Sequence, residues 1–440
     1  MRSFTAAPAH QVRGSLTVPG DKSVSHRALM LAGIADGASE IKGFLPSEDC
    51  LATLAGMRSL GVELQQRSAT EVKVRGVGLR GLKAAKAALD MGNAGTAIRL
   101  MTGLLCGQPF ESTLIGDASL MKRPMERVAK PLRQMGALVS TDNGTPPVIT
   151  GGKSHLHGID YQMPMASAQV KSAILLAALY AEGATTVTAP AVNRDHSERM
   201  LESCGVEVQV DGLKVRLNPP KSLANQALSV PGDFSSAAFF IVAGLLGADR
   251  EGLLIKNVGM NPTRTGLLQI LRAMGGKIEV EEPRFAGKEP VADLRVHASE
   301  LSGIKVPEEL VPLAIDEFPV LFVAAACAHG ETLVTGAEEL RVKESDRIAA
   351  MSEGFKALKT EHEVLPDGMR IAGSAGAPAF GGGRVDSDGD HRIAMAFSIA
   401  SLKAKGPILI DDVANVATSF PGFASLACTV GLKLEESSAA

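Results

Sequence analysis

The sequence lacks an excess of charge of either sign, and it lacks long hydrophobic runs. Its 440 residues include 45 lysines and arginines against 48 aspartates and glutamates, a formal net charge of −3. This excludes a protein that binds nucleic acid through bulk positive charge, so any anion must meet locally clustered cations. Uncharged apolar stretches such as residues 237–248 are shorter than the ~18 to 20 residues of a membrane-spanning helix. We expect no transmembrane segment.

Cysteine is scarce, and its spacing indicates no pairing. The five cysteines are an odd number, lie far apart and sit in apolar surroundings, which predicts reduced core thiols rather than disulfides or a zinc site. They are Cys50, Cys106, Cys204, Cys327 and Cys428. Residues 1–11 show neither the basic nor the apolar region of a secretory signal, so we expect a cytoplasmic protein.

The composition that remains is typical of a globular protein. The chain is 45% hydrophobic and 21% charged, which provides apolar material for a core and too little charge bias for disorder. The length suggests about two or three domains, and two large ones fit best.

One two-part unit recurs six times along the chain. Its first part is a short loop rich in Gly, Ser, Asn or Asp that runs into an apolar helix of small residues. The six loops begin at Gly20, Gly92, Ala166, Gly232, Ile315 and Gly389. Their spacing of roughly 65 to 85 residues is regular enough to indicate an internal repeat.

The second part of each unit is an amphipathic helix that ends near a glycine or polar break, followed in most copies by an alternating strand. A glycine just past the last turn is the expected left-handed cap. The helices are expected at residues 52–61, 127–136, 198–205, 265–275, 346–358 and 423–431. With short β-rich runs between the two helices, each unit reads β-α-β-α-β-β, and the fold class is α/β.

The tetrapeptide Val-Pro-Gly-Asp opens both the first and the fourth unit, at residues 18–21 and 230–233. Because Pro-Gly pairs bend the chain and end regular elements, we predict two domains of three units, with crossings near Pro19-Gly20 and Pro231-Gly232. The predicted domains are residues 21–231, and residues 1–20 with 232–440. A plainer interpretation stays open, in which the loops only cap their helices.

Basic residues gather in or near these loops. Helix N-termini carry partial positive charge and unsatisfied N–H groups, and the arginine fork matches carboxylates and phosphates. The basic residues are Lys22, Arg27, Arg123, Arg194, Lys343, Arg347 and Arg392. They predict a site for small ligands with several carboxylates or phosphates, and their number favours two anionic ligands.

A Gly-x-Gly-x-x-Gly motif at residues 76–81 follows a strand-like run at 71–75. A dinucleotide site needs a buried apolar strand before the glycines and an acidic residue about 20 positions later. Residues 71–75 alternate like a half-exposed strand, and no such acid follows in the right context. We interpret the motif as a glycine-rich turn.

Several stretches of the sequence resemble the 3-phosphoshikimate 1-carboxyvinyltransferase family, whose members are also called 5-enolpyruvylshikimate-3-phosphate synthases. They are residues 19–23 with Arg27, 92–99, 122–125, 341–347 and 390–392. The resemblance covers essentially the whole chain. Residues 166–169 and 416–421 are similar to the second of the family's two bacterial sequence classes.

The resemblance implies a fold and a reaction. The fold is a two-domain inside-out α/β barrel with buried helices, which closes on substrates at the domain interface. The reaction transfers the enolpyruvyl group of phosphoenolpyruvate to the 5-hydroxyl of shikimate 3-phosphate and releases phosphate, in the shikimate pathway of aromatic amino-acid biosynthesis. No metal or organic cofactor is implied, and we expect a monomer that binds these small molecules and neither nucleic acid nor membrane.

The resemblance also implies roles for individual residues. Those that would hold shikimate 3-phosphate are Lys22, Ser23, Arg27, Ser167, Ala168, Gln169, Arg194, Asp316 and Lys343. Those that would hold phosphoenolpyruvate are Lys22, Gly95, Arg123, Gln169, Arg347 and Arg392.

Attack on an enol ether needs a base for the hydroxyl proton and an acid for the methylene carbon. By the same resemblance Asp316 is the base, while Glu344 and Lys22 donate protons to the methylene carbon and the leaving phosphate. Two structural interpretations stay open: a helix cap for Asp316, and for Glu344 an ion pair with Lys343 or Arg347.

Two positions bear on the comparison with the family. Some members have a lysine where this chain has Thr418, so one cation is missing here or supplied elsewhere. Inhibitor-insensitive relatives often carry alanine at the position of Gly95, where glycine leaves room for a slightly longer ligand. We hypothesise that the protein is sensitive to glyphosate.

Two other functions compete with the one that the resemblance implies. UDP-N-acetylglucosamine enolpyruvyl transferases share this fold and chemistry, but they usually carry a reactive cysteine on a loop near the arginine that corresponds to Arg123. Here Cys106 lies in an apolar run, and residues 119–125 contain no cysteine. The other rival, a non-catalytic repeat scaffold or anion-binding module, would show no turnover and would be indifferent to Asp316→Asn.

Overall fold

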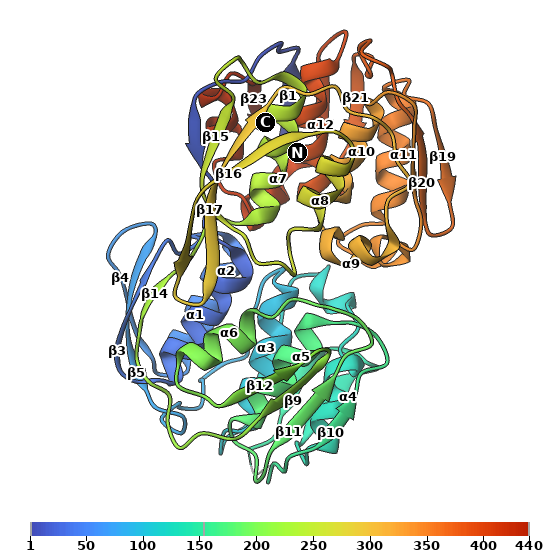
Figure 1. The fold of residues 1–440 in the computed structure, drawn as a ribbon. Coiled ribbons are helices and arrows are strands. Elements are labelled where there is room, and N and C mark those ends of the chain that lie inside the picture. The colour runs from blue at the N-terminus through green and yellow to red at the C-terminus, as the bar shows by residue number, and fades with distance from the viewer. Residues whose placement is uncertain (1, 153–154, 439–440) are drawn as a thin grey trace. The chain divides into compact units, whose positions relative to one another are not determined.

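The computed structural model describes residues 2–152 and 155–438. Within it the chain forms two compact units. Unit 1 consists of Met1–Pro19, Gly232–Arg284 and Pro290–Ala440, and unit 2 of Gly20–Pro231 and Phe285–Glu289. In Figure 1 unit 2 runs mostly from blue to green and unit 1 mostly from yellow to red. The predicted domains also include residues 1, 153, 154, 439 and 440, which lie outside the described residues.

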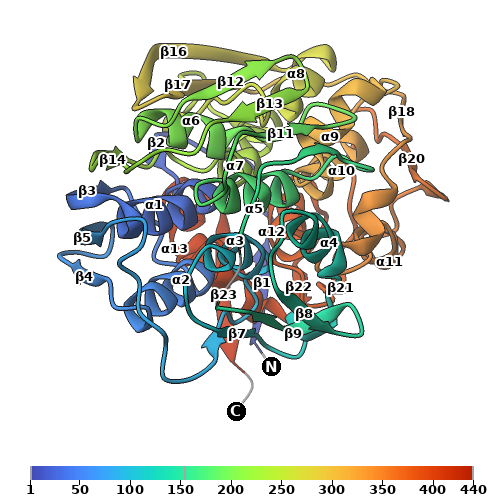
Figure 2. The same ribbon diagram turned by 90° about the horizontal axis from the view of Figure 1, so that it is seen from below.

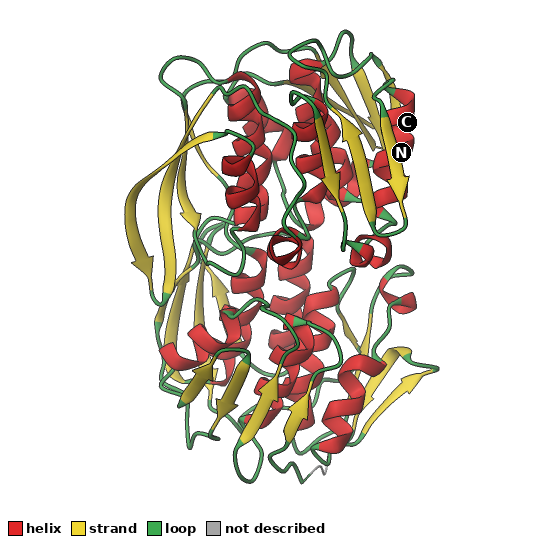
Figure 3. Cartoon of the chain, turned by 45° about the vertical axis from the view of Figure 1, so that its right-hand side comes forward, coloured by secondary structure: helices red, strands yellow, loops and turns green. Residues whose placement is uncertain are grey.

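Three helices at the centre of unit 2 start directly after three of the predicted loops. They are α1 (Lys22–Ile34), α3 (Gly95–Cys106) and α5 (Ala168–Ala178), and nearly every residue in them is buried. A helix buried on all sides must be surrounded by other elements. Strands accordingly lie outside the helices (Figure 3), and α3 packs beside α5 in both views (Figures 1 and 2).

Three four-stranded sheets belong to unit 2. Each starts with a parallel pair and continues with antiparallel pairs, as expected for a repeated unit. In sheet order they are β14 (Ala227–Ser229), β3 (Asp36–Lys42), β5 (Glu71–Val77) and β4 (Glu63–Gln66); β6 (Leu89–Asp90), β7 (Ser112–Ile115), β9 (Thr145–Thr150) and β8 (Val139–Asp142); and β10 (Asp160–Gln162), β11 (Thr185–Thr188), β13 (Lys214–Leu217) and β12 (Val208–Asp211).

Unit 1 repeats this design. Its buried helices are α7 (Phe234–Gly247), α10 (Phe318–Ala326) and α12 (His391–Ala400). Its sheets in order are β16 (Lys277–Ala286), β17 (Glu289–His297), β15 (Leu253–Gly259) and β2 (Ser15–Thr17); β18 (Glu331–Val334), β20 (Gly368–Ala372) and β19 (His362–Leu365); and β21 (Gly383–Asp386), β22 (Ile408–Asp411), β1 (Arg2–Ala7) and β23 (Lys433–Ser438). The N-terminal strands β1 and β2 therefore complete sheets of unit 1.

The outer helices lie where the glycine-terminated patterns predict them. They are α2 (Glu48–Ser59), α4 (Glu126–Gln134), α6 (His196–Ser203), α8 (Gly266–Ala273), α11 (Arg347–Ala357) and α13 (Phe423–Thr429). In unit 2, α2 packs on α1 and α3, and α4 packs on α3 and α5. The predicted α/β fold class is confirmed. The remaining helices are α9 (Val311–Ala314) and the short 3-10 helices η1 (Leu120–Lys122), η2 (Glu308–Leu310), η3 (Glu338–Val342), η4 (Ser401–Lys403) and η5 (Val413–Thr418).

The glycine of each Pro-Gly crossing is required by close packing. A Cβ on Gly20 would overlap the carbonyl oxygen of Gly43, and a Cβ on Gly232 would lie 2.8 Å from the carbonyl oxygen of Asn257. In both copies the next residue is an aspartate whose side chain caps a buried helix, α1 or α7. The repeated tetrapeptide thus makes the same turn twice.

The sequence did not predict that the turn of the β16–β17 hairpin would group with the other unit. Residues Phe285–Glu289 group with unit 2, although both strands otherwise belong to unit 1. In unit 2 the buried carboxylate of Glu289 lies 2.7 Å from Nδ1 of the buried His196. A charged side chain at a hairpin turn is normally solvated, so the sequence offered no signal for this pair.

The chain is irregular around the Gly-x-Gly-x-x-Gly motif. The strand before the Gly-x-Gly-x-x-Gly motif is β5, and residues 78–88 form turns and no helix, as expected of a glycine-rich turn.

Cys50, Cys106 and Cys204 are buried, and burial raises the pKa of the Cys106 thiol to about 12. The prediction of core thiols is wrong for Cys428, which lies exposed on α13. In the described part of the chain, no helix is long and apolar enough to cross a membrane.

Candidate active site

Lys22 is the first residue of α1 in unit 2. Its ammonium lies 2.7 Å from a carboxylate oxygen of Asp49, which belongs to the first turn of α2. A cation at a helix N-terminus is opposed by the helix dipole, and the Asp49 carboxylate offsets that cost. An ammonium has three N–H donors, so the pairing with Asp49 does not by itself exclude that Lys22 binds an anion.

Arg27 lies one turn further along α1 and is buried. Its Nε donates to Ser197 Oγ at 2.8 Å, Nη2 to Ser172 Oγ at 2.7 Å, and Nη1 to the carbonyl oxygen of Ser23 at 2.9 Å. Burial lowers the pKa of Arg27 to about 10, with Glu198 and Asp21 opposing the shift and Arg194 adding to it. The guanidinium stays charged at neutral pH, and Arg194, just before α6, is close enough to act on it.

Ser167, Ala168 and Gln169 form the start of α5. The Ser167 hydroxyl caps the helix by accepting a bond from the backbone N–H of Val170 at 3.4 Å, and Ala168 is the first helical residue. The first turn of a helix has N–H groups without intrahelical partners, which makes it suited to anion binding.

A second cluster in unit 2 surrounds the start of α3. Gln169 bonds Arg99 and Thr96, while Nη2 of Arg123 donates to Asn93 Oδ1 at 2.6 Å. A Cβ built on Gly95, the first residue of α3, would lie 2.9 Å from Nη1 of Arg123 and 3.1 Å from Nη1 of Arg99. Three of the four predicted phosphoenolpyruvate residues of unit 2, Gly95, Arg123 and Gln169, therefore lie together, with little space for a larger side chain at position 95.

In unit 1 the structure brings the predicted acid and base into one cluster with three cations. The Asp316 carboxylate lies 3.3 Å from Nη1 of Arg347, 3.9 Å from Nζ of Lys343 and 3.9 Å from Nη2 of Arg392. Arg392 also donates from Nη1 to the backbone oxygen of Asp316 at 3.1 Å. The capping interpretation of Asp316 does not hold, because α10 starts after Glu317 without a side-chain cap.

Arg347 connects three carboxylates and is 1% exposed. Its Nε bonds Asp390 at 2.8 Å, its Nη2 bonds Glu344 at 2.6 Å, and its Nη1 faces Asp316. Burial disfavours the charged form, but the carboxylates of Asp390, Glu344 and Asp316 outweigh it and raise the pKa of Arg347 above its ordinary value. Two of the three groups predicted to move protons, Glu344 and Asp316, are thus held by one permanent cation.

Glu344 and Lys343 differ in their surroundings. Glu344 makes the ion pair with Arg347 that the sequence left open, and about a third of its side chain is exposed. Lys343 pairs with Glu339 at 2.6 Å, one turn earlier. An ion pair does not by itself exclude a catalytic role for Glu344.

Thr418 ends η5, and its hydroxyl donates to the carbonyl oxygen of Asn415 at 2.7 Å. The Asn415 amide in turn bonds the carbonyl of Gly389, in the loop before α12. The threonine therefore supports that loop and supplies no charge to it.

Several functional partners were missed from sequence. Asn93 and Asp390 lie in the resembling motifs but were given no role, and nothing in the sequence pointed to Asp49. For Ser172 the sequence does contain a signal of a buried contact, because a polar residue in a helix buried on all sides needs a hydrogen-bond partner. Its partner Arg27 lies 145 positions away in the chain.

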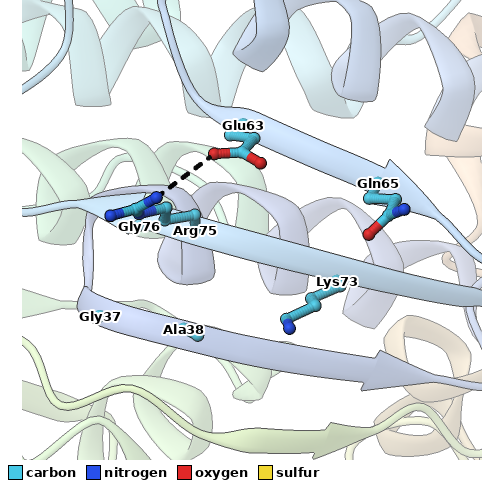
Figure 4. Close-up of a pocket in the computed structure, with 7 residues that line it drawn as sticks. All are labelled: Gly37, Ala38, Glu63, Gln65, Lys73, Arg75 and Gly76. Atoms are coloured by element: carbon cyan, nitrogen blue, oxygen red, sulfur yellow. Dashed lines mark ion pairs between the residues drawn. The ribbon is translucent and has the colours of Figure 1, made fainter.

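A separate hollow of about 550 Å³ lies on the outer face of the β3–β5–β4 sheet (Figure 4). It is lined by Gly37, Ala38, Glu63, Gln65, Lys73, Arg75 and Gly76, with Arg75 paired to Glu63 at 3.9 Å. None of the predicted site residues lines it. The hollow is the solvated face of a sheet that alternates buried and exposed residues. It is separate from the groups of predicted site residues in both units.

The fold places this chain among the enolpyruvyl transferases. Its structure matches the enolpyruvyl transferase NikO of Streptomyces tendae with a TM-score of 0.81 over 100% of this chain and 99% of the other, at 16% identity. It matches an EPSP synthase of Acinetobacter baumannii with a TM-score of 0.91 at 50% identity, covering 100% of both chains.

Sequence comparison narrows the class to one family. Residues 6–426 match EPSP synthase (3-phosphoshikimate 1-carboxyvinyltransferase). The protein named 3-phosphoshikimate 1-carboxyvinyltransferase in Methylococcus capsulatus is 55% identical over 99% of this chain and 98% of its own. Its namesake in Alkalilimnicola ehrlichii is 56% identical over 98% and 96%. The chain belongs to the EPSP synthase family.

Proposed function

We propose that the chain transfers the enolpyruvyl group of phosphoenolpyruvate to the 5-hydroxyl of shikimate 3-phosphate, giving 5-enolpyruvylshikimate 3-phosphate and phosphate. The observation that carries this proposal is identity of 50 to 56%, over nearly the whole chain, to proteins named for this activity. The enzyme then belongs to the shikimate pathway of aromatic amino-acid biosynthesis.

The reaction is an addition followed by an elimination. The 5-hydroxyl oxygen bonds to C2 of phosphoenolpyruvate while C3 gains a proton, and then phosphate leaves C2 as C3 loses a proton and the double bond is restored. Asp316 takes the hydroxyl proton, Glu344 protonates C3, and Lys22 protonates the leaving phosphate. The contacts that Arg347 makes with Glu344 and Asp316 support these roles, because they hold an acid and a base in one cluster.

The cations hold the two polyanions. For phosphoenolpyruvate we propose Arg123, Arg347, Arg392, Lys22, Gln169 and the Gly95 backbone; for shikimate 3-phosphate, Lys22, Ser23, Arg27, Ser167, Ala168, Gln169, Arg194, Lys343 and Asp316. Fixed arginines and helix N-termini stabilise charge without reorganising during the reaction. Arg27 supports this assignment well, because its hydrogen bonds to Ser172 and Ser197 hold the guanidinium in one orientation.

Phosphate release is the direct test. The purified protein receives phosphoenolpyruvate with shikimate 3-phosphate, with UDP-N-acetylglucosamine, or with no acceptor. We expect release with shikimate 3-phosphate alone, and loss of at least ~100-fold in Asp316→Asn. Release only with the nucleotide sugar would overturn the acceptor, and no release in any arm would favour an anion-binding module.

We further propose a cytoplasmic monomer that needs no metal or organic cofactor. All five cysteines lie in the described residues and form no disulfide, as is usual in a reducing compartment. Activity that survives dialysis against a chelator, and a mass of 45.8 kDa by light scattering, are the expected results. Loss of activity that zinc or magnesium restores would contradict the cofactor proposal.

A further inference from the structure

Arg99 is the last residue of the 92–99 stretch that resembles the family, yet neither the sequence nor the proposed chemistry gives it a role. It is the fifth residue of α3 and is 4% exposed. Burying a guanidinium is costly unless its donors are used. The acceptors that Arg99 contacts therefore indicate what it does.

The Arg99 guanidinium joins three segments that are distant in sequence. Nη1 donates to Gln169 Oε1 at 2.6 Å and to the carbonyl oxygen of Gly95 at 3.3 Å, while Nη2 donates to the carbonyl oxygen of Pro124 at 3.3 Å. Gly95 starts α3, Pro124 follows Arg123, and Gln169 is in the first turn of α5. One side chain thus ties together three segments that carry proposed substrate contacts.

The bond to Gln169 determines which way its carboxamide points. A guanidinium can only donate, so the atom of Gln169 that faces Arg99 must be the oxygen. The amide nitrogen must then face the other way, where it donates one hydrogen to Thr96 Oγ1 at 3.0 Å. An amide nitrogen carries two hydrogens, and the second can be donated to a ligand oxygen.

We propose that Arg99 is a positioning residue that orients the Gln169 amide so that its N–H group, and not its oxygen, is presented to the substrates. The proposal rests on the proposed function, in which Gln169 contacts both substrates. Phosphates, carboxylates and hydroxyls accept hydrogen bonds, so an amide turned by 180° would present oxygen to oxygen. The same guanidinium holds the Gly95 backbone beside Arg123.

Lysine cannot replace Arg99 in this role. An ammonium is a compact point charge without the planar fork that reaches acceptors on both sides. Arg99→Lys preserves the charge but satisfies fewer of the three acceptors. The variant therefore separates a requirement for positive charge from a requirement for orientation.

The test compares Arg99→Lys and Arg99→Met with the control Arg58→Met, at an exposed arginine of the same unit. Arg58 also ties segments of unit 2 together, through bonds to the Leu64 carbonyl, but it contacts no proposed site residue. We expect the KM values for both substrates to rise about tenfold or more in both Arg99 variants and to stay unchanged in Arg58→Met. Thermal unfolding of each variant identifies any that fail to fold.

Coupling to Gln169 is the decisive readout. In a Gln169→Ala background, Arg99→Lys should change kcat/KM by less than about threefold, because the group that it orients is gone. Equal effects of Arg99→Lys with and without Gln169 would overturn the proposal, as would unchanged KM values in a folded Arg99→Lys protein. An inactive wild-type enzyme would instead reject the proposed function.

NMR of the Gln169 side-chain amide tests the orienting role without measuring catalysis. In protein labelled with ¹⁵N-glutamine, the side-chain amide signals of Gln169 are identified by their loss in Gln169→Ala. We expect these signals to shift in Arg99→Lys and to stay in place in Arg58→Met. Signals that stay in place in both variants would contradict the orienting role even if activity fell.

Discussion

The two copies of Val-Pro-Gly-Asp make the same turn and the same cap, but they lead to different chemistry. Asp21 accepts a bond from the backbone of Val24 at 2.8 Å, and Asp233 accepts one from Ser235 at 2.7 Å. After Asp21 comes Lys22, which reaches Asp49; after Asp233 comes Phe234, which is 1% exposed in the core. Local sequence sets the turn, and a single following residue decides whether the helix start carries a cation or an apolar side chain.

The serine two positions after each aspartate also differs between the two copies, in its burial and its partners. Ser23 is half-buried at the start of α1, whereas Ser235 is buried, accepts a bond from Arg264 at 2.7 Å and donates a short one to Glu317. In unit 1 the serine of the repeated loop is therefore bonded to buried polar groups of two other segments. In unit 2 Lys22 and Ser23 of the corresponding loop remain partly exposed.

The largest expected effect is on catalysis at the first copy. Lys22→Met, which removes the cation that distinguishes it from the fourth copy, should lower kcat/KM about 10³-fold, or about 4 kcal/mol. The measurement is steady-state phosphate release. Lys73→Met, on the outer sheet face in Figure 4, is the control and should leave activity unchanged. A loss of less than tenfold in Lys22→Met would remove Lys22 from the chemistry.

Replacing each serine by alanine should separate an effect on folding stability from an effect on substrate binding. Ser235→Ala leaves buried Arg264 and Glu317 without their shared hydroxyl and should cost about 1 to 3 kcal/mol of unfolding free energy, with little change in KM. Ser23→Ala should cost less than about 0.5 kcal/mol, while raising the KM for shikimate 3-phosphate about tenfold. Urea unfolding and steady-state kinetics of both variants measure this. Similar profiles for the two serines would mean that the copies do not differ in the way described.

Gly95→Ala tests the space at the second loop of unit 2. The new Cβ would lie 2.9 Å from Arg123 Nη1, so the guanidinium must shift from its present position. We expect the wild-type enzyme to be inhibited by glyphosate and the variant to require at least about tenfold more inhibitor, ~1.4 kcal/mol. The KM for phosphoenolpyruvate should rise less. Inhibition that is the same in both proteins would reject the hypothesis of sensitivity.

The smallest expected effect concerns pH. Burial, with the charges of Lys22 and Arg27, holds the pKa of His26 well below its usual value, whereas α7 has Ala238 at the same place in the repeat. Because the unfolded chain takes up this proton first, stability should fall as pH drops below about 6.5. His26→Gln should flatten that slope by at most ~1.4 kcal/mol per pH unit. Urea unfolding between pH 5 and 8 provides the measurement, and an unchanged slope would exclude His26 as a source.

Local signals explain why much of the fold could be predicted. Glycines beyond the amphipathic helices, and the polar caps before four of the six buried helices, act within a few residues, so the outer helices and the loop positions follow from the pattern. The clusters of the site depend on long-range contacts. Arg27 meets Ser197 across 170 positions and Arg347 meets Asp390 across 43, and no local pattern encodes which of many serines or aspartates will be the partner.

The sequence by itself determined the sixfold repeat, the two Pro-Gly turns and the residue types of an anion site, because turns, caps and periodicity are short-range. Only the tertiary structure decided that one guanidinium holds Glu344 and Asp316 together, that Arg99 orients Gln169, and that Glu289 of a hairpin turn is buried against His196. Apart from the local pair of Arg347 with Glu344, each of these contacts joins a buried charge or dipole to a remote segment. The partner is selected by the requirement that buried polar groups be satisfied, and that requirement acts only once the chain has folded.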